Sequence, residues 1–471
     1  MTPSFPRSNE RHILWVSIDE HTRLIPVDKS STTHITYQPS PSTARPLYFH
    51  PSSIKRIRAH LRSETKGYLN TFTYTGKIYS ALHQTIVTTE HLHQTYPFQI
   101  TYLSSVSAAL SHISTKTTAE KKNLLIWLDA LQDIHPYTWA RAYDSLTHEC
   151  GAIYPPREEI VWADAKIYDM LAFDRIAEET GTWRPKTCYP GTTAECTLSS
   201  ANTSVMKRSN SCGGDHVQIL RADARGGPKC TEGKYPVDHE DELDETGFYR
   251  WFHQDYVTFL VDFGEFRVFV ATEGSSGVAA TRTPYIVNAI HTLWKDDNAD
   301  SSTSSTSTTN MIARNATKLP KGYSAARVTP QTTWPQYPQI SYSTLTAYAL
   351  DVYKRLQATG DIGFSSLNVG ARLDIGVAPD GKGFFVNEVT RWYGAHQFAV
   401  ETQEEPYDSV ARAFAKAFAE TLGAKMRNIE EVNTRVIAKV PSRRRTIAAE
   451  ETVVKRPRRK GHHNYDLRIL G

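Results

Sequence analysis

The segment RLDIGVAPDGKGFFVNEVTRW, residues 372–392, decides the fold that the sequence predicts. Two apolar runs, Leu373–Val377 and Phe384–Val389, flank the turn PDGKG at residues 379–383. Apolar runs on both sides of a glycine-containing turn are typical of a β-hairpin. We therefore expect two neighbouring antiparallel strands here.

Each expected strand carries one acid, Asp374 on the first and Glu388 on the second. A carboxylate in an otherwise apolar strand is costly unless a cation or a hydrogen-bond donor compensates it. Two carboxylates at short range also raise each other's pKa unless positive charge lies between them, and such oxygens suit Mg²⁺ that carries nucleotide phosphates. The alternative is that the two acids form ion pairs with Arg372 and Arg391.

Length and composition indicate a globular protein of two or three domains, because 471 residues can build sizeable cores. Charged residues make up 22% of the chain and hydrophobic residues 39%, which argues against disorder. The net charge is only +4, and much of the excess lies beyond Ser442, so the folded body is near neutral. The near-neutral body therefore argues against a nucleic-acid partner, except through the basic C-terminal tail.

The five cysteines favour neither a disulfide framework nor a zinc site, because they include no CxxC pair and their number is odd. The N-terminal residues MTPSFPRSNERH contain no apolar signal core, and no run of about 18 apolar residues occurs anywhere. We expect a protein of a reducing compartment, the cytoplasm, with no membrane partner.

The first third of the chain predicts a small parallel sheet, because strands alternate with helices there. Residues 13–18, 98–103 and 124–128 have strand patterns, residues 136–148 have a helical pattern, and a short segment at 152–154 follows. We interpret residues 1–155 as a Rossmann-like domain. No GxGxxG motif lies within it, so we predict no dinucleotide site.

Two lysines stand in patterns that suit phosphate binding. Lys166 lies in an expected amphipathic helix over Glu158–Glu179, where the alternative is an ordinary solvated side chain. Lys207 ends a strand before Gly213 and Gly214, and a second strand follows. A hairpin of this kind can close over phosphates, although an ordinary exposed hairpin would give the same pattern.

A further strand, GEFRVFVAT at residues 264–272, places Arg267 among apolar residues, where it needs phosphate or an acid as a partner.

Residues 296–309 form a polar low-complexity insertion. The pattern DSVARAFAKAFAETLG predicts a core helix. The basic clusters within residues 443–460 suit nuclear import, an anionic partner or a solvated tail.

In this order, the segments from Glu158 to Leu422 resemble the ATP-grasp superfamily, which includes D-alanine:D-alanine ligase, biotin carboxylase and ribosomal-protein glutamate ligases. The resemblance lies in the order of the segments and not in one decisive motif. It implies a mixed α/β (α+β) fold, in which an ATP-grasp domain of two α+β subdomains at residues 156–435 clamps a nucleotide. Residues 200–260 would be a small lid, residues 296–320 a loop, and residues 436–471 a basic tail.

The resemblance also implies roles for individual residues. Those expected to contact the nucleotide are Lys166, Lys207, Gly213, Gly214, Gln254, Asp255, Val257 and Glu265. Asp374 and Glu388 are expected to hold Mg²⁺, Arg267 to face phosphate, and Arg391, together with Arg372, to hold the carboxylate of a substrate.

The implied activity is that of an ATP-dependent ligase, with ATP and Mg²⁺ as cofactors and a carboxylate and an amine as substrates. The carboxylate would become an acyl phosphate, which an amine or a related nucleophile then attacks. One position departs from the family pattern, because Thr390 stands where many members have a metal-binding asparagine. The alternative is therefore a nucleotide-binding or regulatory protein with reduced catalysis.

Overall fold

A computed structural model of the chain divides it into two compact units, Met1–Gly423 and Ala424–Gly471. The described residues are 11–17, 24–26, 35–37, 73–74, 77–78, 92, 98–103, 106–122, 124–129, 136–147, 149, 152–164, 166–189, 196–198, 203–208, 217–221, 251–274, 282–295, 322–381, 383–395 and 409–422. The second unit, with the basic tail, lies outside them, and so does the expected polar insertion. Among the described residues, no helix is long and apolar enough to span a membrane.

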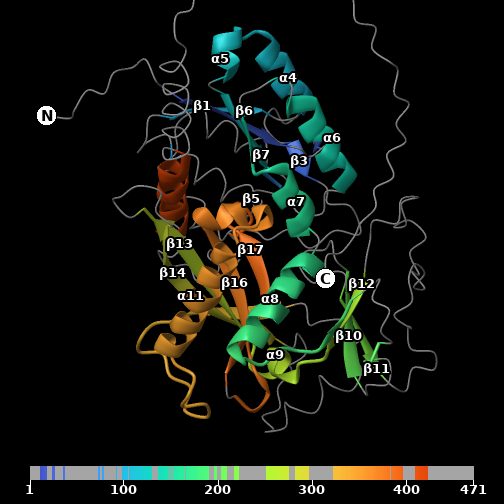
Figure 1. Cartoon of the computed structure of the whole chain (residues 1–471), viewed down its shortest axis with the longest axis vertical. Coiled ribbons are helices and arrows are strands. Elements are labelled where there is room, and N and C mark those ends of the chain that lie inside the picture. Colours follow the sequence, from blue (N-terminus) through green and yellow to red (C-terminus); the bar gives the residue numbers. More distant parts are fainter. Residues whose placement is uncertain are drawn as a thin grey trace, which may run out of the picture. The chain divides into compact units, whose positions relative to one another are not determined.

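The first sheet is parallel, with strand order β6-β1-β7-β8. Its strands are β1 (Arg11–Ser17), β6 (Phe98–Leu103), β7 (Leu124–Asp129) and β8 (Ala152–Tyr154). The helices α4 (Val106–Ser114), α5 (Thr118–Lys122) and α6 (Pro136–Thr147) follow its strands in the chain. The sheet order and the helices agree with the expected α/β alternation (Figure 1). Two short antiparallel pairs, β2 (Leu24–Pro26) with β3 (Ile35–Tyr37) and β4 (Thr73–Tyr74) with β5 (Lys77–Ile78), complete this part.

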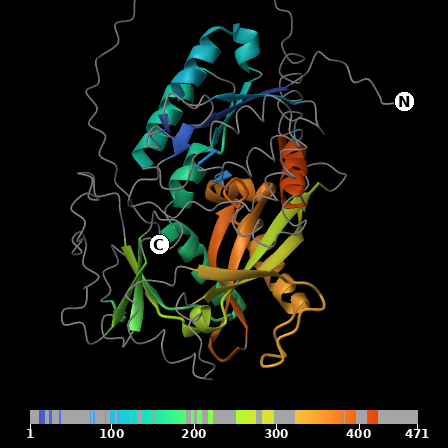
Figure 2. The same cartoon turned by 180° about the vertical axis from the view of Figure 1, so that it is seen from behind.

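A five-stranded antiparallel sheet of order β15-β14-β13-β16-β17 carries most of the predicted site. Its strands are β13 (Glu265–Glu273), β14 (Thr283–Lys295), β15 (Gly322–Arg327), β16 (Gly370–Val377) and β17 (Phe384–Arg391). The hairpin predicted from residues 372–392 is confirmed as β16 and β17, which pair side by side (Figure 1). Figure 2 shows the yellow-green β13 and β14 beside the orange β16 and β17 from behind.

The two faces of this sheet differ, because successive side chains of a strand point to opposite sides. Phe266 and Val268 of β13 pack on one face in a core that includes residues of α11 (Tyr342–Ala358). Phe269 and Ala271 pack on the other face with the helix at 409–422, which the apolar pattern predicted. Beside this second core, the same face carries polar residues.

Helix α11 begins and packs where its sequence indicates. Ser341 is its N-cap and forms a capping box with Thr344, which satisfies backbone N–H groups at the helix start. Its buried residues recur at helical spacing and face the sheet: Leu345, Ala349, Val352, Tyr353 and Leu356.

The helix predicted over Glu158–Glu179 is two helices, α7 (Arg157–Asp164) and α8 (Lys166–Thr180). The contacts explain why one straight helix does not form. Glu159 of α7 and Asp169 of α8 both contact the guanidinium of Arg391. Ten residues of straight helix would separate the two acids by about 15 Å along the axis. One arginine could not contact both.

The strands within residues 200–260, whose role as a lid remains a prediction, belong to a four-stranded antiparallel sheet of order β11-β10-β12-β9. The strands are β9 (Thr187–Cys188), β10 (Thr203–Arg208), β11 (Val217–Arg221) and β12 (Trp251–Asp255). The hairpin predicted around Lys207 is confirmed as β10 and β11. Its expected glycine turn, Gly213 and Gly214, lies outside the described residues.

Candidate functional site

A polar cluster covers one face of β13, β16 and β17, and two lysines reach it from elsewhere in the chain. Its members are Glu265, Arg267, Arg372, Asp374, Asn387, Glu388 and Thr390, with Lys166 of α8 and Lys207 of β10. We call these nine residues the polar cluster. Their segments are more than 200 residues apart at the extremes (Lys166 to Thr390), so the folded chain brings them together.

Arg267 lies at the centre of the polar cluster because β13 pairs with β16 and places Arg267 opposite Asp374. Its guanidinium forms ion pairs with Asp374 and, at 2.9 Å, with Glu265 Oε2. Burial alone would lower the pKa of Arg267, but the attraction of Asp374 and Glu265 raises it above its ordinary value. The sequence prediction that this arginine needs an acidic or phosphate partner is therefore met by two acids.

Asp374 has both carboxylate oxygens occupied by arginines. Arg372 Nε donates to Oδ1 at 2.7 Å, Arg372 Nη2 donates to Oδ2 at 2.9 Å, and Arg267 also pairs with Oδ2. The Asp374 side chain is 1% exposed. The ion-pair alternative thus describes Asp374 correctly in its pairing with Arg372. A metal ligand role for Asp374 remains a prediction, and it requires an arginine to release an oxygen.

Asn387 joins the polar cluster through a β-bulge. Asp374 pairs with Glu388 and the next residue of β16, Ile375, pairs with Val386, so Asn387 is an extra residue in β17. Its side chain donates to Glu265 Oε1 at 2.9 Å and accepts a hydrogen bond from Lys207 Nζ at 3.1 Å. Strict alternation from Glu388 would point Asn387 to the opposite face, but the bulge re-aims its side chain towards Glu265 and Lys207.

Glu388 meets Lys166, whose Nζ lies 3.5 Å from Glu388 Oε2. Burial would raise the pKa of Glu388, but Lys166 and then Arg372, Arg267 and Lys207 hold it below its ordinary value. Glu388 is therefore ionised at neutral pH. Its side chain is 36% exposed, so its carboxylate is accessible to a ligand.

Lys207 is held by hydrogen bonds from its Nζ to Gln254 Oε1 at 2.7 Å and to Asn387 Oδ1 at 3.1 Å. Burial, and next the positive charge of Lys166, lower the pKa of Lys207 to about 8. Gln254 in turn donates to Thr187 Oγ1 at 3.0 Å. A lysine held in this way by neutral amides keeps its charge available for an anion.

The other predicted nucleotide contacts lie on β12 and just after it. The backbone N–H of Asp255 donates to the carbonyl of Lys186 at 2.9 Å, and its side chain accepts from the backbone N–H of Lys186 at 3.1 Å. Val257 is buried and is the N-cap of α9 (Thr258–Asp262). Neither belongs to the polar cluster, and their contact with adenine remains a prediction.

Arg391 is not brought into the polar cluster. It lies next to Thr390, and alternation along β17 turns it to the other face of the sheet. There it donates to both oxygens of Asp169 and to the carbonyl of Gly363 at 2.8 Å. Its position supports a structural role, in contrast to the expected contact with substrate.

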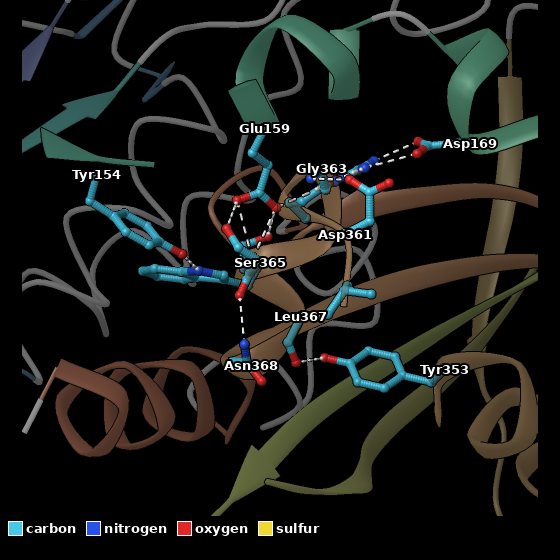
Figure 3. A network of polar contacts seen from close by, with 12 residues as sticks. Tyr154, Glu159, Asp169, Tyr353, Asp361, Gly363, Ser365, Leu367 and Asn368 are labelled. Carbon is cyan, nitrogen blue, oxygen red and sulfur yellow. Dashed lines mark hydrogen bonds and ion pairs between the residues drawn. The ribbon is translucent and has the colours of Figure 1, made fainter. Parts of the chain in front are cut away.

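Figure 3 shows a network of polar contacts in which Glu159 and Asp169 lie on two different helices, and both of these acids pair with Arg391. Glu159 is fully buried and accepts hydrogen bonds from Ser365 Oγ at 2.7 Å and from the backbone N–H of Ser366 at 3.0 Å. Burial raises the pKa of Glu159 and of Asp169, and Arg391 opposes both shifts. The network joins α7 and α8 to β17.

An open pocket of about 450 Å³ is lined by residues between Asp174 on α8 and Thr187 at the start of β9. Two residues of its wall, Arg184 and Thr187, contact neighbours of polar-cluster residues. Arg184 donates to the carbonyl of Val386 next to Asn387, and Thr187 accepts from Gln254. The pocket therefore opens next to the residues that hold Lys207.

The charges of the polar cluster suit a polyphosphate better than a bare cation. Four basic side chains face three carboxylates: Lys166, Lys207, Arg267 and Arg372, with Glu265, Asp374 and Glu388. Burial raises the pKa of Glu265, and the attraction of Arg267 opposes that shift. Among the residues that the structure describes, no group of three His, Cys, Asp or Glu could hold a metal ion unaided. The ionised and accessible carboxylate of Glu388 fits a metal ion that arrives already bound to phosphates.

The sequence did not identify Asn387, Gln254 as the side-chain partner of Lys207, or Arg184. A bulge has no reliable sequence signal, so Asn387 could not be placed beside Glu265 from alternation alone. Gln254 was expected to contact the nucleotide, and its side-chain bond to Lys207 depends on how β12 pairs with β10.

No protein-family model matches the chain, and no curated protein matches it. Solved structures that are similar to it include D-cycloserine synthetase DcsG, at 16% identity over 71% of this chain and 93% of that chain, with a TM-score of 0.40. D-alanine–D-alanine ligase from Bacillus anthracis is 12% identical over 72% and 94%, with a TM-score of 0.35. Its complex with ATP is 11% identical over 89% and 99%, with a TM-score of 0.36.

Proposed function

We propose that the chain is an ATP-dependent ligase of the ATP-grasp kind, which activates a substrate carboxylate as an acyl phosphate and joins it to an amine or a related nucleophile. One observation carries the proposal. Lys207, from the lid strands, bonds to Asn387 at 3.1 Å, and Lys166, from α8, pairs with Glu388 at 3.5 Å. Two cations from distant segments thus meet the acid-bearing strand at one place.

The polar cluster provides what phosphoryl transfer requires. Negative charge spreads over the phosphoryl oxygens in the transition state, and fixed cations stabilise it without having to reorganise. Lys207 and Arg267 are held in place by Gln254, Asn387, Asp374 and Glu265 before a ligand arrives. The carboxylate oxygen of the substrate would be the attacking atom, so the protein needs no covalent nucleophile.

Mg²⁺ bound with the nucleotide would neutralise phosphate charge and orient the transferred group. Glu388 is the residue of this chain that we propose as its ligand, because its carboxylate is ionised and accessible. Asp374 would join it only after giving up a contact with Arg267 or Arg372. Thr390 is occupied in the same way, since its hydroxyl accepts from Arg372 at 3.1 Å.

A second candidate function is nucleotide binding without turnover. The specific observation in its favour is that Arg372 contacts both Asp374 and Thr390, the two positions besides Glu388 where a metal ligand is expected. If those contacts persist with nucleotide bound, only one acid remains for the metal. Binding of ATP would then be retained while phosphoryl transfer is lost.

The two candidates are separated by measuring ATP binding by calorimetry, with and without Mg²⁺, and ADP formation over panels of carboxylic acids and amines. The ligase predicts ADP formation that requires one acid and one amine together. Binding without ADP formation for any acceptor supports the second candidate. Absence of binding contradicts both.

Variants test the assignment of residues. We expect Lys207→Ala to weaken ATP binding about 10- to 100-fold, because a charge-assisted hydrogen bond is lost.

We expect Glu388→Gln and Asp374→Asn to abolish Mg²⁺-dependent ADP formation while thermal unfolding shows a folded protein. Lys354→Ala on α11 and Glu158→Gln on α7 are matched controls, because both side chains are exposed away from the polar cluster. Wild-type activity in Glu388→Gln would remove the metal assignment.

A further inference from the structure

A pair of thiols lies in the lid sheet, among residues to which the proposed function gives no role. Cys188 on β9 and Cys196 after it are both reduced. Cys196 Sγ lies 3.2 Å from His253 Nδ1, and His253 Nε2 lies 2.5 Å from Ser204 Oγ. We call these four residues the dithiol cluster.

The sheet register brings Cys188 to the same place. Cys188 of β9 pairs directly with His253 of β12 in the antiparallel ladder. Side chains of directly paired residues lie on the same face, with Cβ atoms about 5 Å apart. Besides burial, the Cys196 thiol contributes to raising the pKa of Cys188. Both cysteines therefore lie beside the imidazole of His253, although eight positions separate them in the chain.

The imidazole of His253 is placed to handle the proton of Cys196. His253, Ser204 and Cys196 are buried, and burial lowers the pKa of His253, so the ring is neutral at neutral pH. A neutral imidazole has one donor and one acceptor nitrogen. If Nε2 donates to Ser204, Nδ1 can accept the thiol proton, and if Ser204 donates, Nδ1 can donate to a thiolate. In the first case His253 can take the proton as the sulfur of Cys196 reacts, and in the second case it stabilises the thiolate, which is the reactive form.

The dithiol cluster is not arranged as a metal site. No set of three His, Cys, Asp or Glu side chains within the described part of the chain has the geometry to hold a metal ion, and Cys188, Cys196 and His253 are all in that part. A pair of neighbouring thiols beside a neutral imidazole is instead suited to reversible oxidation.

We propose that Cys188 and Cys196 are a redox-active pair that a small hydroperoxide, such as hydrogen peroxide, converts into an intramolecular disulfide, with His253 as the proton acceptor. The sulfur of Cys188, the more exposed thiol, attacks one peroxide oxygen. An S–O bond forms, the O–O bond breaks, and the thiol proton leaves with the second oxygen as water. Cys188 is then a sulfenic acid.

The second step closes the disulfide. Cys196 passes its proton to His253, and its sulfur attacks the sulfur of Cys188. The S–S bond forms, the S–O bond breaks, and the departing hydroxide takes the proton from His253 as a second water. In total two thiols lose two electrons and one peroxide gains them. Burial, followed by the hydrogen bond from Cys196, raises the pKa of Cys188, so the first step is slow at neutral pH.

Oxidation would act on Lys207 through the neighbouring residue pair. The only two residue pairs between β9 and β12 in the described ladder are Cys188 with His253 and Thr187 with Gln254. Gln254 holds Lys207 at 2.7 Å and donates to Thr187 at 3.0 Å. A disulfide that draws Cys188 towards Cys196 would therefore shift this support. This consequence rests on the proposed function, whereas the thiol chemistry does not.

The test uses the full-length protein, exposed to hydrogen peroxide, alkylated to block remaining thiols, digested and measured by mass spectrometry. We expect a product in which Cys188 and Cys196 are joined, lighter by two hydrogen atoms and restored by dithiothreitol. The proposal is overturned if both thiols are still alkylated when a dithiol peptide in the same solution is fully oxidised. A bond from either one to another cysteine overturns it as well.

Variants test each role. In Cys196→Ser the closing step is impossible, so we expect Cys188 to accumulate as a sulfenic acid that dimedone traps. In His253→Gln and His253→Asn we expect disulfide formation to slow at least about tenfold. Disulfide formation at the wild-type rate in both histidine variants would overturn the role of His253. Cys150→Ser is the control and should react as wild type, and circular dichroism checks the fold of each variant.

The link to nucleotide binding has a separate readout. With the disulfide quantified, we expect the affinity for ATP to fall at least about fivefold and to return with dithiothreitol. Unchanged affinity in fully oxidised protein overturns the link but leaves the dithiol pair standing. If neither redox form binds ATP, the proposed function fails, while the mass measurement still decides the thiol chemistry.

Discussion

The ammonium group of Lys207 titrates close to physiological pH, because burial and the nearby Lys166 lower its pKa to about 8. Phosphate prefers the charged form, so binding above that pKa requires uptake of a proton. We expect the affinity for ATP to be greatest below the pKa and to fall as pH rises through it, approaching tenfold per pH unit. Isothermal titration calorimetry from about pH 7 to about pH 9.5 measures this dependence.

Lys207→Arg is the matched control for the pH dependence. A guanidinium keeps its charge across this range, so the affinity of the variant should change little with pH. A wild-type affinity that stays constant up to about pH 9.5 would show that Lys207 is not the group that meets the phosphates.

Gly264 precedes Glu265 and has a backbone conformation that other residues avoid, with φ of +90°. A Cβ atom there would lie 2.0 Å from the carbonyl oxygen of Thr292 on the neighbouring strand β14. We expect Gly264→Ala to lower the free energy of unfolding by about 2 kcal/mol or more, because backbone strain and a steric clash add. Urea denaturation followed by fluorescence measures this loss.

Variants at Gly181 and Gly383 separate the effect of backbone strain from that of the steric clash. Gly181 also has a positive φ, of +65°, but nothing lies within 4 Å of an added Cβ, so Gly181→Ala should cost about 1 kcal/mol. Gly383 has no close neighbour either and no positive φ, so Gly383→Ala should be nearly neutral. If all three variants lose the same stability, the assigned clash with Thr292 is wrong.

The contact between α8 and β17 depends on the buried ion pair of Asp169 with Arg391. Asp169 lies one helical turn after Lys166, and Arg391 lies three residues after Glu388. The ion pair therefore fixes the position of α8 at which Lys166 meets Glu388. Arg391 can therefore influence the contact between Lys166 and Glu388, although it lies outside the polar cluster.

We expect Asp169→Asn to lower the free energy of unfolding by about 3 kcal/mol or more, because it leaves Arg391 buried without its counter-charge. Thermal unfolding by calorimetry measures the change. Asp351→Asn is the control, since Asp351 pairs with Arg355 on the exposed side of α11 and should cost at most about 0.5 kcal/mol. Equal losses in the two variants would contradict the assigned role of the buried pair.

The division of the whole chain into Met1–Gly423 and Ala424–Gly471 predicts that the first unit works alone. All nine residues of the polar cluster belong to that unit. We expect a chain that ends at Gly423 to bind ATP as the full chain does, with an equal rise in unfolding free energy, about 2.7 kcal/mol at 100 times the Kd. Loss of binding on truncation would place part of the site in residues 424–471.

Much of the fold could be predicted because its signals are local. Apolar runs around a glycine-containing turn indicated β16 and β17, and helical spacing indicated the helix at 409–422. These patterns work because strand alternation and helical periodicity depend on neighbours in the chain. The single expected helix over Glu158–Glu179 failed because its division depends on Arg391, which is distant in sequence.

The residue types of the candidate site were likewise legible from the chain, since acids and arginines inside apolar strands require partners wherever they are buried. Which of these side chains pair with one another could not be predicted from the sequence. Asn387 entered the polar cluster and Arg391 left it because one extra residue in β17 and the approach of α8 set which side chains meet. Such choices arise from contacts between segments hundreds of residues apart, whose relative placement no local pattern encodes, so they exist only once the chain has folded.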